Sequence, residues 1–153
     1  MRVRFLSPTE AGRQATWLVA EEPWRGLGYR EAPLGRWLAR KARGKQVRAA
    51  IEARGIVGLL VVQPEVLLGD FIALLAVKPA AAGRGIGRAL IDDALARAAK
   101  AGTKWLYTSS DTGNRAAAVF YRKCGFVRVG RLPDLVRAGH TEILWRRPVS
   151  RPG

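Results

Sequence analysis

A glycine-rich turn between an apolar run and a helical repeat constrains the fold of this chain most. Residues 71–77, FIALLAV, are continuously apolar, and their length of seven favours a buried strand over a helix. The stretch AGRGIGR follows at residues 82–88, and apolar residues then recur at helical spacing as far as Gly102. A buried strand that leads through glycines into a helix is typical of an α/β domain.

The same turn predicts an anion-binding site. Glycines let backbone N–H groups approach a ligand closely, and the first turn of a helix leaves N–H donors unpaired at its positive end. A phosphate or pyrophosphate would fit there, assisted by Arg84 and Arg88. The dinucleotide pattern G-x-G-x-x-G fails because Arg88 and Leu90 stand where its last glycine should be, and no P-loop Gly-Lys-Ser/Thr follows. A plain strand-to-helix turn is the alternative that this segment leaves open.

Periodicity and turn residues predict the remaining elements. Ser7 and Glu10 occupy the N-cap and N3 positions of a helix expected over residues 8–22, and a basic amphipathic helix follows around residues 34–45. We expect strands at residues 2–6, 47–53, 56–63, 71–77, 104–109, 126–132 and 140–146, and further helices after the glycine turn and at 114–124. No repeat or linker divides this order, so we predict a single mixed α/β domain over residues 1–148 with a short tail at 149–153.

The charge of the chain favours anionic partners. Its 27 basic and 12 acidic residues give a net charge of +15, which attracts nucleic acid, acidic lipid and polyphosphate cofactors alike. The basic stretch at residues 36–48 is interpreted as a solvated helix face, so we expect no nucleic-acid partner. One cysteine, Cys124, and one histidine, His140, allow neither an internal disulfide nor a metal cluster. With no apolar run long enough to cross a bilayer, we expect a cytoplasmic protein that binds no metal and no membrane.

Two segments carry a family resemblance. LLAVKPAAAGRGIGRAL, residues 74–90, looks like the cofactor-binding motif of the GNAT superfamily, which is Gln/Arg-x-x-Gly-x-Gly/Ala after the fourth strand. NRAAAVFYRKCGF, residues 114–126, is similar to the Asn-x-x-Ala-x-x-x-Tyr-x-x-x-Gly-Phe element of the same family. The resemblance covers residues 71–146, while the first 70 residues match in element order alone. It implies a central mixed, mostly antiparallel sheet of about seven strands flanked by about four helices.

The resemblance also implies an activity and its residues. The protein would be an N-acetyltransferase that moves an acetyl group from acetyl-CoA (coenzyme A) directly to a primary amine of a small molecule or a protein N-terminus. Tyr121 would be the catalytic proton donor to the departing thiolate. The residues that would bind the cofactor are Leu75, Ala76 and Val77 along the pantetheine arm, Gly83, Arg84, Gly85, Ile86, Gly87 and Arg88 around the pyrophosphate, and Asn114 with Tyr121.

The sequence departs from the family pattern at two positions. Ala82 stands where the family has Gln or Arg, which leaves the phosphate contacts to backbone donors, Arg84 and Arg88. Phe71 stands where some members carry a glutamate base, and the neighbouring Asp70 faces the other side of the strand. The proton acceptor is therefore one of Glu65, Asp70, Asp111 or Glu142, or a chain of water molecules.

Several residues have two interpretations from sequence alone. Asn114 suits a helix N-cap as well as a cofactor contact, and Tyr121 falls on an apolar helix face that a core tyrosine would also occupy. The wall of the acceptor pocket is expected to include Trp24, Leu27, Tyr29 and Trp145. A homodimer, a non-catalytic acyl-CoA sensor and a basic nucleic-acid-binding protein remain open alternatives.

Overall fold

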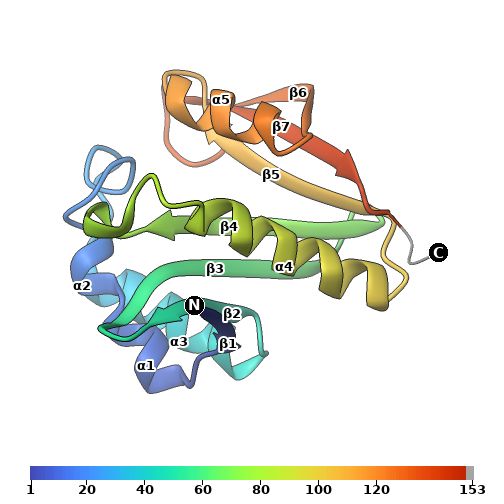
Figure 1. Ribbon diagram of the computed structural model, residues 1–153. Helices are drawn as coiled ribbons and strands as arrows, with labels where there is room; N and C mark the ends of the chain where they lie inside the picture. Colours follow the sequence, from blue (N-terminus) through green and yellow to red (C-terminus); the bar gives the residue numbers. More distant parts are fainter. Residues whose placement is uncertain (151–153) are drawn as a thin grey trace. The chain divides into compact units, whose positions relative to one another are not determined.

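The computed structural model describes residues 1–150, so residues 151–153 of the predicted tail lie outside the described part. The elements are β1 Arg2–Phe5, α1 Pro8–Arg13, α2 Ala15–Leu18, α3 Glu31–Arg43, β2 Val47–Glu52, β3 Gly55–Val66, β4 Gly69–Val77, the 3₁₀ turn η1 Pro79–Ala81, α4 Ile86–Lys100, β5 Trp105–Asp111, α5 Arg115–Lys123, β6 Val127–Pro133 and β7 Thr141–Pro148 (Figure 1). The glycine turn thus connects a strand to a helix, as predicted.

The strands form one hydrogen-bonded sheet in the order β1-β2-β3-β4-β5-β7-β6. The β4–β5 pair is parallel, whereas β1–β2, β2–β3, β5–β7 and β6–β7 are antiparallel. The β5–β7 neighbourhood brings together strands that are separated in sequence by a helix and by β6. This arrangement confirms the predicted mixed, mostly antiparallel sheet of seven strands.

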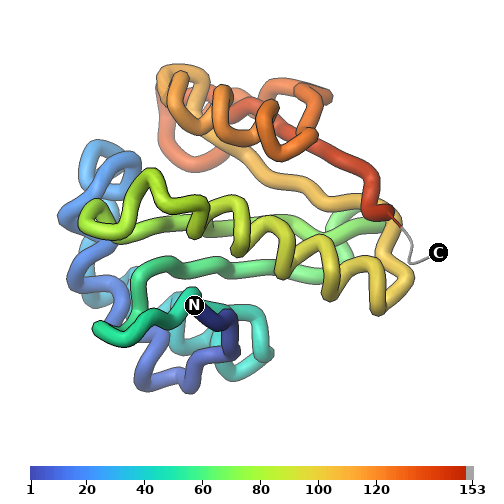
Figure 2. Tube along the Cα trace, in the orientation of Figure 1, coloured from blue at the N-terminus to red at the C-terminus, as the bar shows by residue number. Residues whose placement is uncertain are grey.

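The chain divides into two compact units. Unit 1 comprises Met1–Val62 and Leu74–Leu90, and unit 2 comprises Gln63–Ala73 and Ile91–Gly153. The tube in Figure 2 follows β3, β4 and α4 as continuous elements that belong partly to each unit. The single domain over residues 1–148 stays a prediction.

In unit 1 the first helix begins as predicted but ends early. The side chain of Ser7 accepts the N–H of Glu10 at 3.1 Å, with Pro8 in the first turn. The expected helix over residues 8–22 is wrong, because it breaks at Gln14 and α2 ends at Leu18. Gln14 causes the break locally: its amide donates to the Glu10 carbonyl and accepts the Trp17 indole N–H, which stabilises a turn there.

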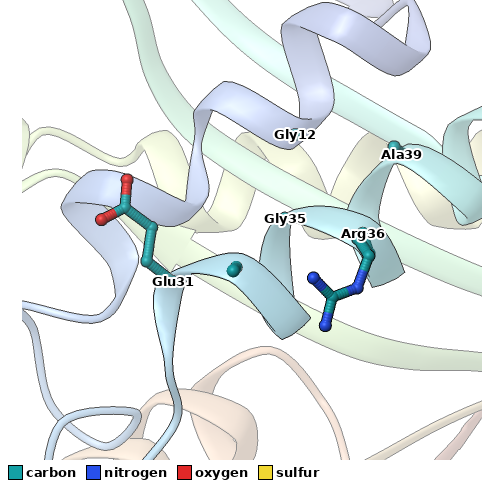
Figure 3. A pocket seen from close by; sticks show the side chains of 6 residues that line it. Gly12, Glu31, Gly35, Arg36 and Ala39 are labelled. Carbon is teal, nitrogen blue, oxygen red and sulfur yellow. The ribbon is translucent and has the colours of Figure 1, made fainter.

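Helices α1 and α3 approach each other closely through glycines. A Cβ added to Gly12 would lie 3.3 Å from the carbonyl oxygen of Gly35, and α3 buries Leu34, Leu38 and Ala42. A shallow pocket of about 440 Å³ lies along this contact, and Figure 3 shows its lining residues: Gly12, Glu31, Ala32, Gly35, Arg36 and Ala39.

The hairpin of β2 and β3 positions the start of α4. Ala49, Leu59 and Val61 are fully buried in it. A Cβ at Gly58 of β3 would lie 3.1 Å from side-chain carbons of Ile86 and Leu90, so the absence of a side chain lets the first turn of α4 rest against the strand. The glycine turn that precedes α4 is thereby held in place by apolar packing.

Unit 2 contains α5 and the β5, β7 and β6 strands. Its core includes Leu106, Tyr121, Phe126 and Trp145, each at most 7% exposed. The rings of Tyr121 on α5 and Trp145 on β7 are 6.3 Å apart between centroids, so the helix packs directly on the sheet (Figure 1).

Candidate active site

The glycine turn of unit 1 leaves room for a ligand. Gly83 and Gly85 have φ values of +76° and +79°, a region that favours glycine, and nothing lies within 4 Å of a Cβ built on either. Gly85 immediately precedes α4 and has no side chain to cap the helix, and no acidic residue stands in the first turn. Backbone donors and an open surrounding are what a pyrophosphate requires, so the residues present fit the phosphates of coenzyme A.

The arginines beside the turn differ in their surroundings. Arg84 forms a bidentate pair with Glu52 of β2, with Nη2 2.7 Å from Oε1 and Nη1 3.3 Å from Oε2. The Arg84 side chain is 52% exposed, so water screens this pair and its contribution to stability is below about 1 kcal/mol. Arg88 lies exposed on the first turn of α4. A weak, exposed pair leaves Arg84 able to exchange Glu52 for a phosphate.

Strand β4 alternates in burial over its last residues. Leu74 and Ala76 are each 5% exposed, whereas Leu75 and Val77 are half-buried. Of the expected pantetheine contacts, the structure therefore places Ala76 on the better-buried face and the other two on the opposite face. The register that pairs β4 with β5 runs from Gly69–Trp105 to Ile72–Thr108.

The expected acceptor-wall residues fall into two settings. Trp24 and Leu27 are half-buried and Tyr29 is 41% exposed, all in the turns that follow α2. The Tyr29 N–H donates to the Trp24 carbonyl at 3.0 Å, so these aromatic residues belong to one compact loop. Trp145 is different: it is fully buried in unit 2 and its indole N–H donates to Ser110 Oγ at 2.9 Å. The structure assigns Trp145 to the core.

At the start of α5, Asn114 acts as the N-cap. Its Oδ1 accepts the Ala117 N–H at 3.1 Å, which satisfies one of the donors of the first turn. Asp111 holds the preceding turn through the Gly113 N–H at 2.7 Å. Of the two interpretations of Asn114, the structure shows the cap, and the cofactor contact stays a prediction.

Tyr121 is a buried, hydrogen-bonded tyrosine. It makes edge-to-face contacts with Phe120 and Phe126 at centroid distances of 5.3 and 5.5 Å. Its hydroxyl is hydrogen-bonded to Thr108, whose own Oγ1 donates to the Ile72 carbonyl at 3.2 Å. Burial raises the pKa of Tyr121 above its usual value, although the Thr108 hydrogen bond opposes the rise. The hydroxyl is therefore protonated at neutral pH, as a proton donor must be.

A polar cluster on β5 and β7 also belongs to unit 2. Glu142 is 6% exposed and its Oε1 accepts the Ser109 hydroxyl at 3.0 Å, while Asp111 Oδ2 lies 2.9 Å from His140 Nδ1. Burial raises the pKa of Glu142, against the opposing Ser109 hydrogen bond. The Gly113 N–H chiefly lowers the pKa of Asp111. Sequence reasoning did not single out Ser109; its place two residues before Asp111, on the same strand face, was the available signal.

Comparison with known proteins identifies the family. The family model of the acetyltransferase (GNAT) domain matches residues 37–128, which is more than half of the chain. The chain belongs to the GNAT acetyltransferases. Enzymes of this family take their acetyl group from acetyl-CoA, so this GNAT protein is an N-acetyltransferase with acetyl-CoA as its cofactor. The predicted family and enzyme class are confirmed.

Solved structures share the fold at low sequence identity. Ard1 from Thermoplasma volcanium is 24% identical with a TM-score of 0.76, and 98% of each chain is covered. The ribosomal-protein-S18-alanine N-acetyltransferase from Escherichia coli is 19% identical with a TM-score of 0.75, covering 99% of this chain and 96% of that one. An aminoglycoside 6'-N-acetyltransferase complexed with coenzyme A is 17% identical with a TM-score of 0.78 over both entire chains. At these identities the likeness establishes the fold alone.

No curated protein sequence matches the chain significantly. Within residues 1–150, no helix combines the length and the apolar character needed to cross a bilayer.

Proposed function

We propose that this GNAT protein acetylates a primary amine of a small molecule or a protein N-terminus by direct attack, without an acyl-enzyme. The observation that carries the proposal is the open glycine turn at the start of α4, where Gly83 and Gly85 leave space for phosphates. Cys124 is buried and 2% exposed, which argues against its use as a covalent nucleophile.

The chain's own residues would hold the cofactor in two places. Backbone N–H groups over residues 83–88 bind the pyrophosphate, and the backbone of Leu75 and Val77 binds the pantetheine arm. Arg84 and Arg88 add charge beside the phosphates, and Asn114 contributes a further contact. Bound acetyl-CoA supplies the thioester whose carbonyl carbon the amine attacks, so that an N–C bond forms and the C–S bond breaks.

Tyr121 would supply the proton that the departing sulfur needs. Because burial raises its pKa, the hydroxyl keeps its proton until a stronger base develops beside it. Thr108, beside the Tyr121 hydroxyl, opposes the rise in pKa that burial causes. A tyrosine acid suits this step since a thiolate, with a pKa of about 8.5, needs only modest help to leave.

The acceptor is an amine, and its binding wall would be the loop that carries Trp24, Leu27 and Tyr29. The half-buried Trp24 and Leu27 and the exposed Tyr29 suit an apolar or flat part of a substrate. Two structural neighbours, an alanine N-acetyltransferase of a ribosomal protein and an aminoglycoside acetyltransferase, support peptide and small-molecule amines as the first acceptors to test.

We place the protein in the cytoplasm, where a buried free thiol such as Cys124 stays reduced.

The test is release of free thiol from acetyl-CoA in the presence of two acceptors, a peptide with an N-terminal alanine and an aminoglycoside. Calorimetric titration with acetyl-CoA is run alongside. Thiol release that depends on the acceptor supports the proposal. Binding of acetyl-CoA without turnover on any amine would instead favour a non-catalytic sensor, and absence of binding would reject both.

A further inference from the structure

The polar cluster on β5 and β7 holds one buried carboxylate, that of Glu142. We propose that Glu142 takes the proton from the acceptor ammonium, that Ser109 positions its carboxylate, and that the proton leaves past Asp111 and His140. This inference rests on the proposed acetyl transfer. It assigns a role that the family resemblance leaves unassigned, since Phe71 occupies the strand position where some members carry a glutamate base.

The four acidic candidates have different surroundings. Glu65 is exposed to solvent near the end of β3, and Asp70 is half-buried on β4. Both carboxylate oxygens of Asp111 have partners: Oδ1 accepts the Gly113 N–H, and Oδ2 is hydrogen-bonded to His140. Glu142 alone of these four is at most 9% exposed, and of its two oxygens Oε1 accepts the Ser109 hydroxyl. A buried carboxylate held on one oxygen has the other to receive a proton.

The cross-strand register aligns the cluster. Asp111 pairs with Glu142, and Ser109 lies two residues before Asp111, so the three side chains project from one face of the β5–β7 pair. Exposure then rises along the row, since the Asp111 and His140 side chains are 20% and 41% exposed. A proton that reaches Glu142 therefore has a polar route to water.

The charged and titratable groups around Glu142 are few. Asp111 and His140 act on it electrostatically, and Glu142 in turn raises the pKa of Tyr121 on α5. On β6 its register partner is the uncharged Leu132. Arg146, on the same face of β7, has its guanidinium carbon 3.9 Å from the centre of the Trp105 ring. Among residues 1–150 no ion pair neutralises Glu142, and burial raises the pKa of this carboxyl in the direction that suits a base.

The proton balance closes with these two groups. An acceptor ammonium gives one proton to the free oxygen of Glu142 and becomes a neutral nucleophile. After attack, Tyr121 gives its proton to the sulfur, and the proton left on the new amide nitrogen restores the Tyr121 hydroxyl. Glu142 then releases its proton to water, so that one proton appears in solution for each acetyl group transferred. The raised pKa values of Tyr121 and Glu142 suit these roles of acid and base.

The test compares Glu142→Gln with Glu65→Gln, the same change at an exposed candidate. With an ordinary amine near pH 7, Glu142→Gln is expected to lower kcat/KM about 10²- to 10⁴-fold and to leave acetyl-CoA affinity within a few-fold. Glu65→Gln stays within about two-fold of the wild type. Hydroxylamine, which is already neutral at this pH, needs no base, and so the loss in Glu142→Gln disappears with it.

Ser109→Ala supplies a readout that a structural role would not move. The Ser109 hydroxyl lowers the pKa of Glu142, so removing it shifts the acid limb of the kcat/KM profile to higher pH.

The pH dependence of the melting temperature tests the assignment without turnover. Since the folded pKa of Glu142 is raised, its protonated form favours folding at low pH and that contribution is lost as pH rises through the folded pKa. Wild type should therefore lose melting temperature relative to Glu142→Gln as pH rises from the ordinary glutamate range through the raised folded pKa of Glu142.

An equal loss with hydroxylamine and with the ordinary amine, or full activity in Glu142→Gln with an unchanged pH profile, would overturn the assignment. No thiol release from the wild type with any nucleophile would overturn the proposed function itself, and with it this inference.

Discussion

The glycine turn of unit 1 and the aromatic cluster around Tyr121 in unit 2 differ in the groups that they present and in their burial. Gly83 and Gly85 are exposed and have open space where side chains would be, so they offer backbone groups. Tyr121 is 7% exposed and contacts aromatic rings. It presents one hydroxyl, which stays protonated because burial raises its pKa. The contrast suggests that binding affinity depends on the open turn and the chemical step on the buried hydroxyl.

The two helix starts show the same contrast. Helix α5 uses the side chain of Asn114 to satisfy its Ala117 N–H, whereas α4 begins after Gly85, which has no side chain to use. A helix whose first-turn N–H groups are satisfied by a capping side chain has fewer donors left to bind an anion. Substitutions at the two sites should therefore change different kinetic constants.

The largest effect is expected from Tyr121→Phe. Loss of an acid that acts only on the departing thiolate should lower kcat about 10²- to 10⁴-fold while acetyl-CoA affinity stays within a few-fold. Turnover is measured beside a thermal melt. Tyr107→Phe is the matched control, since Tyr107 is 5% exposed and its hydroxyl donates to the Leu67 carbonyl at 3.1 Å. It should lose about 0.5–1.5 kcal/mol of stability and no specific activity. Full activity in a folded Tyr121→Phe would remove the catalytic role.

A smaller effect, on binding alone, is expected from Gly85→Val. At φ +79° a side chain costs about 1–2 kcal/mol of stability, and the branched group also fills the space proposed for phosphate. The dissociation constant for acetyl-CoA should rise at least about tenfold, measured by calorimetry. Gly102→Val is the control, because Gly102 has φ +74° and the same open surrounding just after α4. It should show a similar loss of stability with unchanged affinity, and equal affinity in both variants would reject the phosphate turn.

The smallest effect is expected at the exposed pair of Arg84 and Glu52. Arg84→Gln should raise the KM for acetyl-CoA about two- to three-fold at low salt, and Glu52→Gln, which frees the guanidinium, should lower it by a similar factor. Both differences should shrink as ionic strength rises, because salt screens exposed charges. Steady-state kinetics at two salt concentrations test this. A salt dependence that survives unchanged in Arg84→Gln would mean that its guanidinium does not face the phosphates.

Local signals in the sequence were sufficient for much of the fold. The apolar run of β4, the glycines before α4 and the Asn114 cap each depend on neighbours within a few residues, so they could be read without a structure. The first helix shows where this fails. Its N-cap was predicted, but the break at Gln14 comes from side-chain hydrogen bonds to Glu10 and Trp17 that compete with the helical pattern.

By itself the sequence determined the family, the element order and the position of the glycine turn, because these follow from residue type and spacing. Only the tertiary structure decided which acid is buried, which acid pairs with Arg84 and which tryptophan belongs to the core. Glu142 and Ser109 are 33 residues apart and meet because β7 pairs with β5. Burial and cross-strand register are properties of the folded chain, and the pKa of a carboxyl depends on them more than on its neighbours in sequence.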